Sequence, residues 1–229
     1  MNTYRKNAVI AGALFLIGFA GIFIMVFAGP ILNDSNHLGK AAENANQLTL
    51  GGLFQLIMAL ACSGIAIWLY PVLKRHDEAL ALWSVGFRMI EAMLFVIAAI
   101  GLLSLLSLSQ DCLETGTLDV SYSQTLGNLI LAVHDWSEVL GLTAWSLGAL
   151  MYHYIFYQSK LVPRWLSTWG LVGVPLVILA GMLIMFRLTD SGSTVQALLN
   201  LPLGLQEIPL AIWLIVKGFN PSAIGSGTA

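Results

Sequence analysis

Long apolar runs separated by short polar segments dominate the chain. The runs are approximately Ala8–Ala28, Leu50–Tyr70, Leu80–Leu106, Leu126–Tyr157, Leu166–Phe186 and Val195–Val216. A helix needs about 20 apolar residues to cross a hydrocarbon core about 30 Å thick, and each run reaches that length. The pattern therefore predicts an all-α, polytopic membrane bundle with six transmembrane helices.

The fourth run is too long for one simple crossing. It predicts either a helix that projects beyond the membrane, or a first third, Tyr122 to Trp136, that lies at the interface before the crossing begins. We expect residues 1–219 to form a single six-helix transmembrane domain. The small and polar residues 220–229 predict a short flexible C-terminal tail.

Composition supports the membrane interpretation and narrows the partners. Hydrophobic residues make up 58% of the chain and charged residues only 10%, too few charges to cover a water-soluble domain. The expected partner is the lipid bilayer, with a small-molecule or ion ligand as a further one. A net charge of −2 without a basic cluster argues against nucleic acid. The oligomeric state stays open.

The basic residues between the runs predict the orientation. One side holds seven of them and the other side two; the seven are Arg5, Lys6, Lys74, Arg75, Lys160, Arg164 and Lys217, and the two are Lys40 and Arg187. Because Lys and Arg collect in cytoplasmic segments, both termini are expected in the cytoplasm.

The few charges inside the runs are the main candidates for function, because an ionisable group in hydrocarbon is costly. Arg88 and Glu91 lie three residues apart on the third span and can touch. Glu207 on the sixth span shares a face with Asn200. Counted from the cytoplasmic ends, the three charges lie about 12, 17 and 14 Å deep. We therefore expect Arg88 between the two acids, as a ligand- or proton-binding cluster that Gln55 on the second span extends.

Glu207 is the candidate proton-exchanging group, because it lies between Pro202 and Pro209. Prolines remove backbone donors, so the sixth span is expected to break near midplane beside the acid, as at transporter sites. The alternative is a structural Arg88–Glu91 pair, with prolines that only bend the helix.

The first and fifth spans carry no ionisable residue in their interiors and are expected to serve as scaffold. On the first span, Ala11 and Gly18 lie seven residues apart on one face. Small residues at this spacing favour a close approach of another helix.

A second polar group lies near the outer end of the fourth span. His134, Asp135 and Glu138 supply an imidazole and two carboxylates, which could bind a divalent metal. No further metal-site motif accompanies them, so a polar cap at the helix entrance is the competing interpretation. No cofactor is strongly implied, and the absence of catalytic motifs favours a protein that is not an enzyme.

Two segments carry a resemblance to a known family. YPVLKRHDEALALWSVGFRMIEA, Tyr70 to Ala92, and SKLVPRWLSTWGLVG, Ser159 to Gly173, resemble the bacterial membrane-protein family of domain of unknown function 4386. The resemblance covers nearly the whole chain and implies a multi-pass protein of the prokaryotic cytoplasmic (inner) membrane. It implies no substrate, cofactor or catalytic residue.

Three functions remain open at this point. The first is binding or transport of a small molecule or ion through the cluster on the third and sixth spans, which we favour. The second is a non-catalytic accessory or sensor protein with structural charges. The third is a metal-dependent membrane enzyme at the outer interface.

Overall fold

Six long helices build the molecule, as the sequence predicts. The computed structural model describes residues 3–115 and 120–225 and is all-α. The helices are α1 (Thr3–Gly18), α2 (Gly21–Phe27), α3 (Gly29–Leu32), α4 (His37–Glu43), α5 (Ala45–Leu73), α6 (Glu78–Thr115), α7 (Val120–Ser159), α8 (Arg164–Met185), α9 (Thr194–Val216) and α10 (Pro221–Gly225). Within the described ranges, α1 with α2, α5, α6, α7, α8 and α9 form six segments that are long and apolar enough to cross a membrane.

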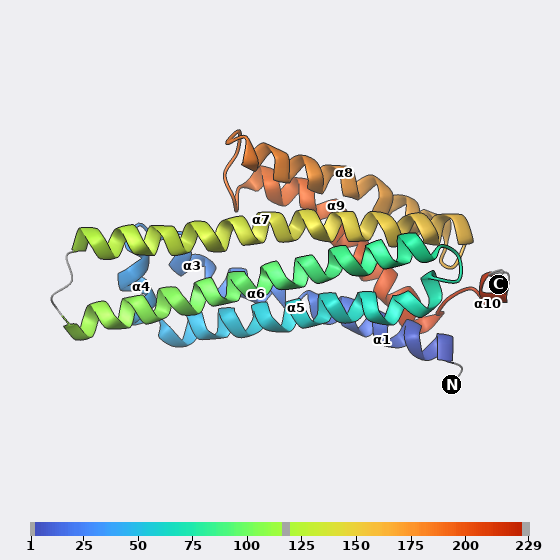
Figure 1. Cartoon of the computed structure of the whole chain (residues 1–229), viewed down its shortest axis with the longest axis horizontal. Coiled ribbons are helices and arrows are strands. Elements are labelled where there is room, and N and C mark those ends of the chain that lie inside the picture. Colours follow the sequence, from blue (N-terminus) through green and yellow to red (C-terminus); the bar gives the residue numbers. More distant parts are fainter. Residues whose placement is uncertain (1–2, 116–119, 226–229) are drawn as a thin grey trace.

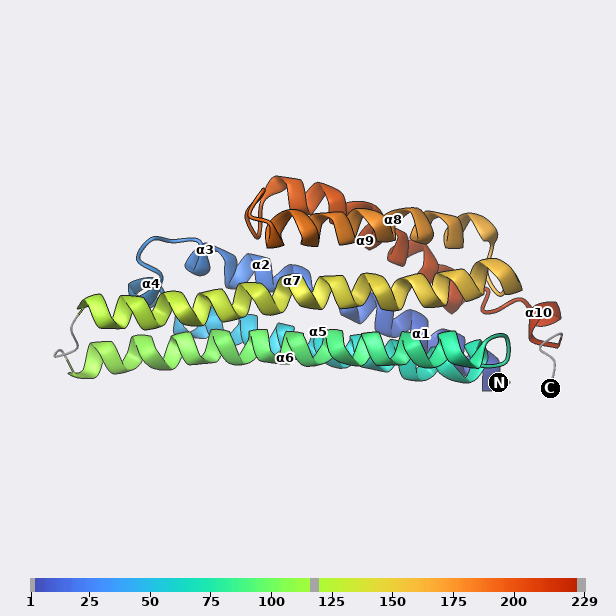
Figure 2. The ribbon, with the colours of Figure 1, turned by 45° about the horizontal axis from the view of Figure 1, so that its top comes forward.

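The six spans form a closed ring. Each span packs on the next along the chain, and α9 returns to pack on α1. α6 and α7 run side by side over their whole length, and α8 and α9 lie along the half nearest the start of α1 (Figures 1 and 2). α3 and α4 lie at the opposite end, where α4 packs on α6. Side chains in the middle of this ring face protein instead of lipid.

α6 and α7 are much longer than a bilayer requires. They contain 38 and 40 residues, or about 57 and 60 Å at 1.5 Å per residue, against a hydrocarbon core of about 30 Å. α7 continues through Tyr122–Trp136 without a break, so this segment belongs to one long helix. That the segment projects beyond the membrane stays a prediction.

The first span is broken where the sequence predicts one straight helix. α1 ends at Gly18 and α2 begins at Gly21. Around the break the backbone keeps its hydrogen bonds by forming three-residue turns, with Phe19 N donating to Leu16 O at 3.2 Å and Ala20 N to Ile17 O at 2.8 Å. These bonds matter because hydrocarbon offers no substitute partner. The break therefore redirects the chain without leaving those amides unpaired.

The sixth span differs from the expectation in the opposite way. α9 continues from Thr194 to Val216 with both Pro202 and Pro209 inside it, so the expected break beside Glu207 is absent from this helix. Membrane helices tolerate proline where neighbouring groups satisfy the freed carbonyls.

α1 and α9 close the ring at the end that carries most of the basic residues. A Cβ at Gly12 would lie 2.7 Å from the carbonyl oxygen of Ala211, so only glycine fits there. The Arg5 guanidinium donates to carbonyls at the C-terminal end of α9, at 3.2 Å to Leu214 and 2.5 Å to Ile215. These carbonyls have no partner inside the helix, so Arg5 caps α9. Ala11 is buried, whereas a Cβ at Gly18 would meet nothing within 4 Å, so Gly12 instead of Gly18 makes the close approach.

The tail predicted from residue 220 is helical over part of its length. α10 spans Pro221–Gly225, and Ala223 within it is buried. Residues 226–229 lie outside the described residues, and flexibility of the tail stays a prediction.

Ring closure at Gly12 can be tested with single methyl groups. We expect Gly12→Ala to lower the free energy of unfolding by about 1–3 kcal/mol, because the added carbon forces α1 away from α9. Gly86→Ala is the matched control, since a Cβ there meets nothing within 4 Å and alanine favours the helix. Unfolding in mixed detergent micelles measures both; equal stability of the two variants would contradict the proposed close approach.

Candidate functional site

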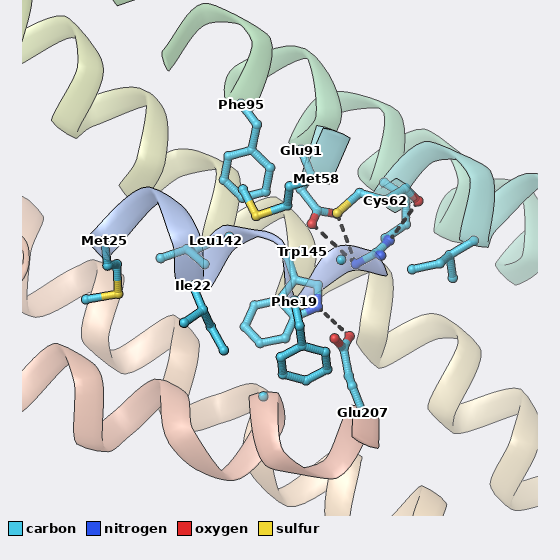
Figure 3. Close-up of a pocket in the computed structure, with 15 residues that line it drawn as sticks. Phe19, Ile22, Met25, Met58, Cys62, Glu91, Phe95, Leu142, Trp145 and Glu207 are labelled. Carbon is cyan, nitrogen blue, oxygen red and sulfur yellow. Dashed lines mark hydrogen bonds and ion pairs between the residues drawn. The ribbon is translucent and has the colours of Figure 1, made fainter. Parts of the chain in front are cut away.

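The interior of the ring contains a cavity of about 230 Å³ at the level of the buried charges. Residues of five of the six spans line it, including residues at the break in the first span (Figure 3). The lining residues used below are Phe19, Ile22 and Met25 of the first span, Cys62 of α5, Arg88 and Glu91 of α6, Trp145 of α7, and Gly204 and Glu207 of α9. All three charges of the predicted cluster thus meet at one cavity.

Arg88 and Glu91 form an ion pair within α6. Nη1 of Arg88 lies 3.1 Å from Oε2 of Glu91, and the two side chains are only 1% and 2% exposed. Nε of Arg88 also donates to the carbonyl of Cys62 at 3.4 Å, which connects the pair to α5. A buried charge of either sign would be costly alone, so each residue requires the other.

Gly148 of α7 makes room for the Arg88 side chain. A Cβ at Gly148 would lie 3.0 Å from Cγ of Arg88, so the aliphatic part of the arginine packs directly on the α7 backbone. Ser84, one turn before Arg88, donates to the Gly148 carbonyl at 3.2 Å. The arginine is therefore held in place by α5 and α7 as well as by Glu91.

Glu207 faces the same cavity from α9 but is not paired with a cation. Its Oε1 accepts hydrogen bonds from Nε1 of Trp145 at 2.8 Å and from the hydroxyl of Tyr152 at 3.4 Å. Among the residues that the structure describes, no ion pair joins it to Arg88. The structure thus places Glu207 beside the pair, bound by two aromatic donors of α7, where the sequence analysis expected direct contact with Arg88.

Trp145 and Tyr152 are site residues that the sequence analysis missed. With Glu138 they recur every seven residues, a spacing that places all three on one face of α7. This spacing was a usable signal: an indole N–H and a phenol on the same helical face as an intramembrane acid are suitable donors for a carboxylate on another helix.

Gln55 and Asn200 are not part of the cavity. Gln55 is fully buried and donates through Nε2 to Oε1 of Glu138. Oδ1 of Asn200 is buried without a hydrogen-bond partner. The proposed cluster therefore reduces to Arg88, Glu91 and Glu207.

The second polar group does not converge on one point. Nδ1 of His134 lies 3.1 Å from the carbonyl oxygen of Ala98, Glu138 bonds to Gln55, and Asp135 is exposed. Over residues 3–115 and 120–225, no group of three or more His, Cys, Asp and Glu side chains is arranged to hold a metal ion. His134 and Glu138 thus have separate partners, and Asp135 lies on the exposed face of α7.

The interior on the basic side of the cavity is filled with aromatic side chains. Phe15 of α1 and Tyr152 of α7 are fully buried and meet edge to face, with ring centroids 6.1 Å apart. Phe156, one turn further along α7, extends this packing with its centroid 5.8 Å from that of Tyr152. These rings separate the cavity from the basic end of the bundle.

The match to known proteins agrees with the resemblance seen in the sequence. Residues 10–218 match the family described as Domain of unknown function (DUF4386). The chain belongs to this family. The match reaches from the first span to the end of the sixth, so it contains every residue of the cavity. Comparisons with curated proteins and with solved structures gave no match.

The Arg88–Glu91 pair can be tested by removing one charge and then both. We expect Arg88→Met to lower the free energy of unfolding by about 3–5 kcal/mol, because Glu91 then remains buried without a cation. The double variant with Arg88→Met and Glu91→Leu should recover most of that loss, since apolar residues of similar volume replace the pair. Unfolding midpoints in detergent measure both; a double variant less stable than either single variant would contradict a simple ion pair.

Proposed function

We propose that this multi-pass membrane protein binds a small molecule or ion in the cavity formed by Arg88, Glu91 and Glu207. The observation that supports the proposal is that a cavity reaches intramembrane charges from two different spans. A bundle in which charges only specify packing gains nothing from empty space beside them, because close packing is what stabilises helix association in lipid.

The two acids support this proposal unequally. Arg88 and Glu91 neutralise each other within one helix, which favours a structural role for the pair and is the observation behind the accessory-protein alternative. Glu207 has no such partner: both of its hydrogen bonds end on Oε1, and among the described residues Oε2 has none. Glu207 is therefore the residue on which ligand binding would depend.

The location of the protein is part of the proposal. Segments at residues 74–77 and 160–164 lie at the same end as the start of α1 and the end of α9 (Figure 1). The seven basic residues belong to these segments, and several stack on aromatic rings, with Arg164 5.3 Å from the ring centroid of Tyr157. We propose that this end faces the cytoplasm of a prokaryotic cell, and that residues 1–219 act as one domain of the inner membrane.

Orientation is testable with reporter fusions in a bacterial host. Green fluorescent protein fused after residue 229 should fluoresce, because it folds in the cytoplasm, and alkaline phosphatase at that position should be inactive. Fusions at Asp34, before α4, should show the reverse. Phosphatase activity at the C-terminus would contradict the proposed orientation.

Ligand binding is testable even while the ligand is unidentified. Purified protein is heated with a library of small amines, carboxylates and neutral amphiphiles, and the melting temperature is compared with that of Gly204→Leu. A Cβ at Gly204 meets nothing within 4 Å, so the leucine should fill the cavity without disturbing the helices. Compounds that bind in the cavity should stabilise the natural protein and not the variant.

Two controls make this result specific. Gly86→Leu adds the same side chain on the exposed surface of α6 and should leave every stabilisation unchanged. Cys62 lines the cavity, and the variant Cys112→Ser leaves it as the single cysteine. In this variant a bound compound should slow the reaction of Cys62 with N-ethylmaleimide. A library in which no compound distinguishes Gly204→Leu from Gly86→Leu would overturn the proposed function.

A further inference from the structure

The cavity opens on the lipid-facing surface of the bundle. Ile22 and Met25 line it and are 56% and 70% exposed on the outside of α2. Both belong to the first membrane span, about 20–25 Å along it from Ala8 at 1.5 Å per residue. The opening is therefore at the depth of hydrocarbon, on the half of the membrane away from the basic end. A molecule that uses it would come from the lipid phase.

The break in the first span lies beside this opening. α1 packs on both α5 and α9, whereas α2 packs on α5 and α3. Gly18, Phe19 and Gly21 at the turn line the cavity directly. The cavity thus lies where α1, which touches α9, is followed by α2, which packs on α5 and α3.

The walls are apolar and aromatic, and the charges lie at the inner end. Figure 3 shows Met25 and Ile22 at one side of the cavity, with Glu91 and Glu207 at the other and the rings of Phe19 and Trp145 beside Glu207. A ligand that fits this order has an apolar part directed to the lipid and a polar part directed inward.

Charge balance selects the sign of the polar part. The inner end holds one cation, Arg88, and two carboxylates, Glu91 and Glu207, and the cation is already paired with Glu91. Glu207 receives only neutral donors, from Trp145 and Tyr152. A positively charged group would supply the missing countercharge, and the faces of Phe19 and Trp145 attract cations as well.

The volume limits how much of the ligand enters. Cavities that hold a drug-sized molecule measure about 300–1,000 Å³. This one, at about 230 Å³, has room for an ammonium head and the adjoining carbons, while an attached chain would extend through the opening into lipid.

We propose that the cavity takes the cationic head of a single-chain amphiphile, an alkylammonium, directly from the lipid phase, with Glu207 as its counterion and Phe19 and Trp145 beside it. This inference rests on the proposed function and specifies its ligand class.

The test measures equilibrium binding of tritiated dodecyltrimethylammonium to the protein in phosphatidylcholine nanodiscs, with empty nanodiscs as the blank. Unlabelled competitors are 2,2-dimethyltetradecane, which has the same shape without the charge, and dodecyl sulfate, which carries the opposite charge. We expect only the unlabelled cation to compete. Glu207→Gln should weaken binding by about tenfold or more, because a buried charge pair is lost, and Gly204→Leu should abolish it.

Two matched variants separate the site from general effects. Glu138→Gln removes a different carboxylate that does not line the cavity, and Gly86→Leu adds a side chain on the exposed surface of α6; both should bind as the natural protein does. If the neutral or anionic competitor displaces the probe equally well, or Glu207→Gln binds it unchanged, the ligand class is wrong while the cavity still binds. If Gly204→Leu binds the probe unchanged, this cavity is not its site.

Discussion

The contact between the first and last spans determines whether the interior of this protein exists. Apolar surfaces gain little by meeting one another in lipid, so helices there associate through close packing and hydrogen bonds. The ring uses both at its basic end, where Gly12 lets the backbones of α1 and α9 touch and Arg5 binds the last carbonyls of α9. Without this closure Glu207, on α9, would face hydrocarbon. Its hydrogen bonds to Trp145 and Tyr152 of α7 would then be the only interactions that offset the free energy of placing a carboxylate in lipid.

Beyond the break at Phe19 and Ala20, the first and sixth spans separate. The interior therefore differs on the two sides of the break. On the basic side the interior is filled by rings such as Phe15 and Tyr152; on the other it is open beside α2. The charges lie at the boundary between these regions. The Arg88–Glu91 pair lies within α6, and Arg88 also contacts α5 and α7. Among the described residues, Oε2 of Glu207 has no hydrogen-bond partner. Stability is therefore expected to depend on the pair, whereas the proposed ligand binding would depend on Glu207.

Hydropathy alone predicted the fold, because crossing a bilayer imposes a length and polarity on each span that few other structures share. Depth counting also brought Arg88, Glu91 and Glu207 to one level, since the rise of a helix is fixed. Side-chain partners were less predictable. Glu207 is bound by Trp145 and Tyr152, and nothing in a hydropathy profile states which face of α7 meets α9. The prolines of the sixth span suggested a break there, but α9 is continuous. The break is in the first span, between Gly18 and Gly21, where the sequence has two glycines, which are weak helix formers, and no proline.

The cap that Arg5 places on α9 has a consequence for biogenesis. Arg5 belongs to the first span, and the carbonyls it binds belong to residues 214–216, more than 200 positions later in the sequence. The first span is therefore synthesised well before the backbone carbonyls that Arg5 binds. The contact that closes the ring can form only after the sixth helix has been made, and a chain truncated before that helix would lack the carbonyls that Arg5 caps.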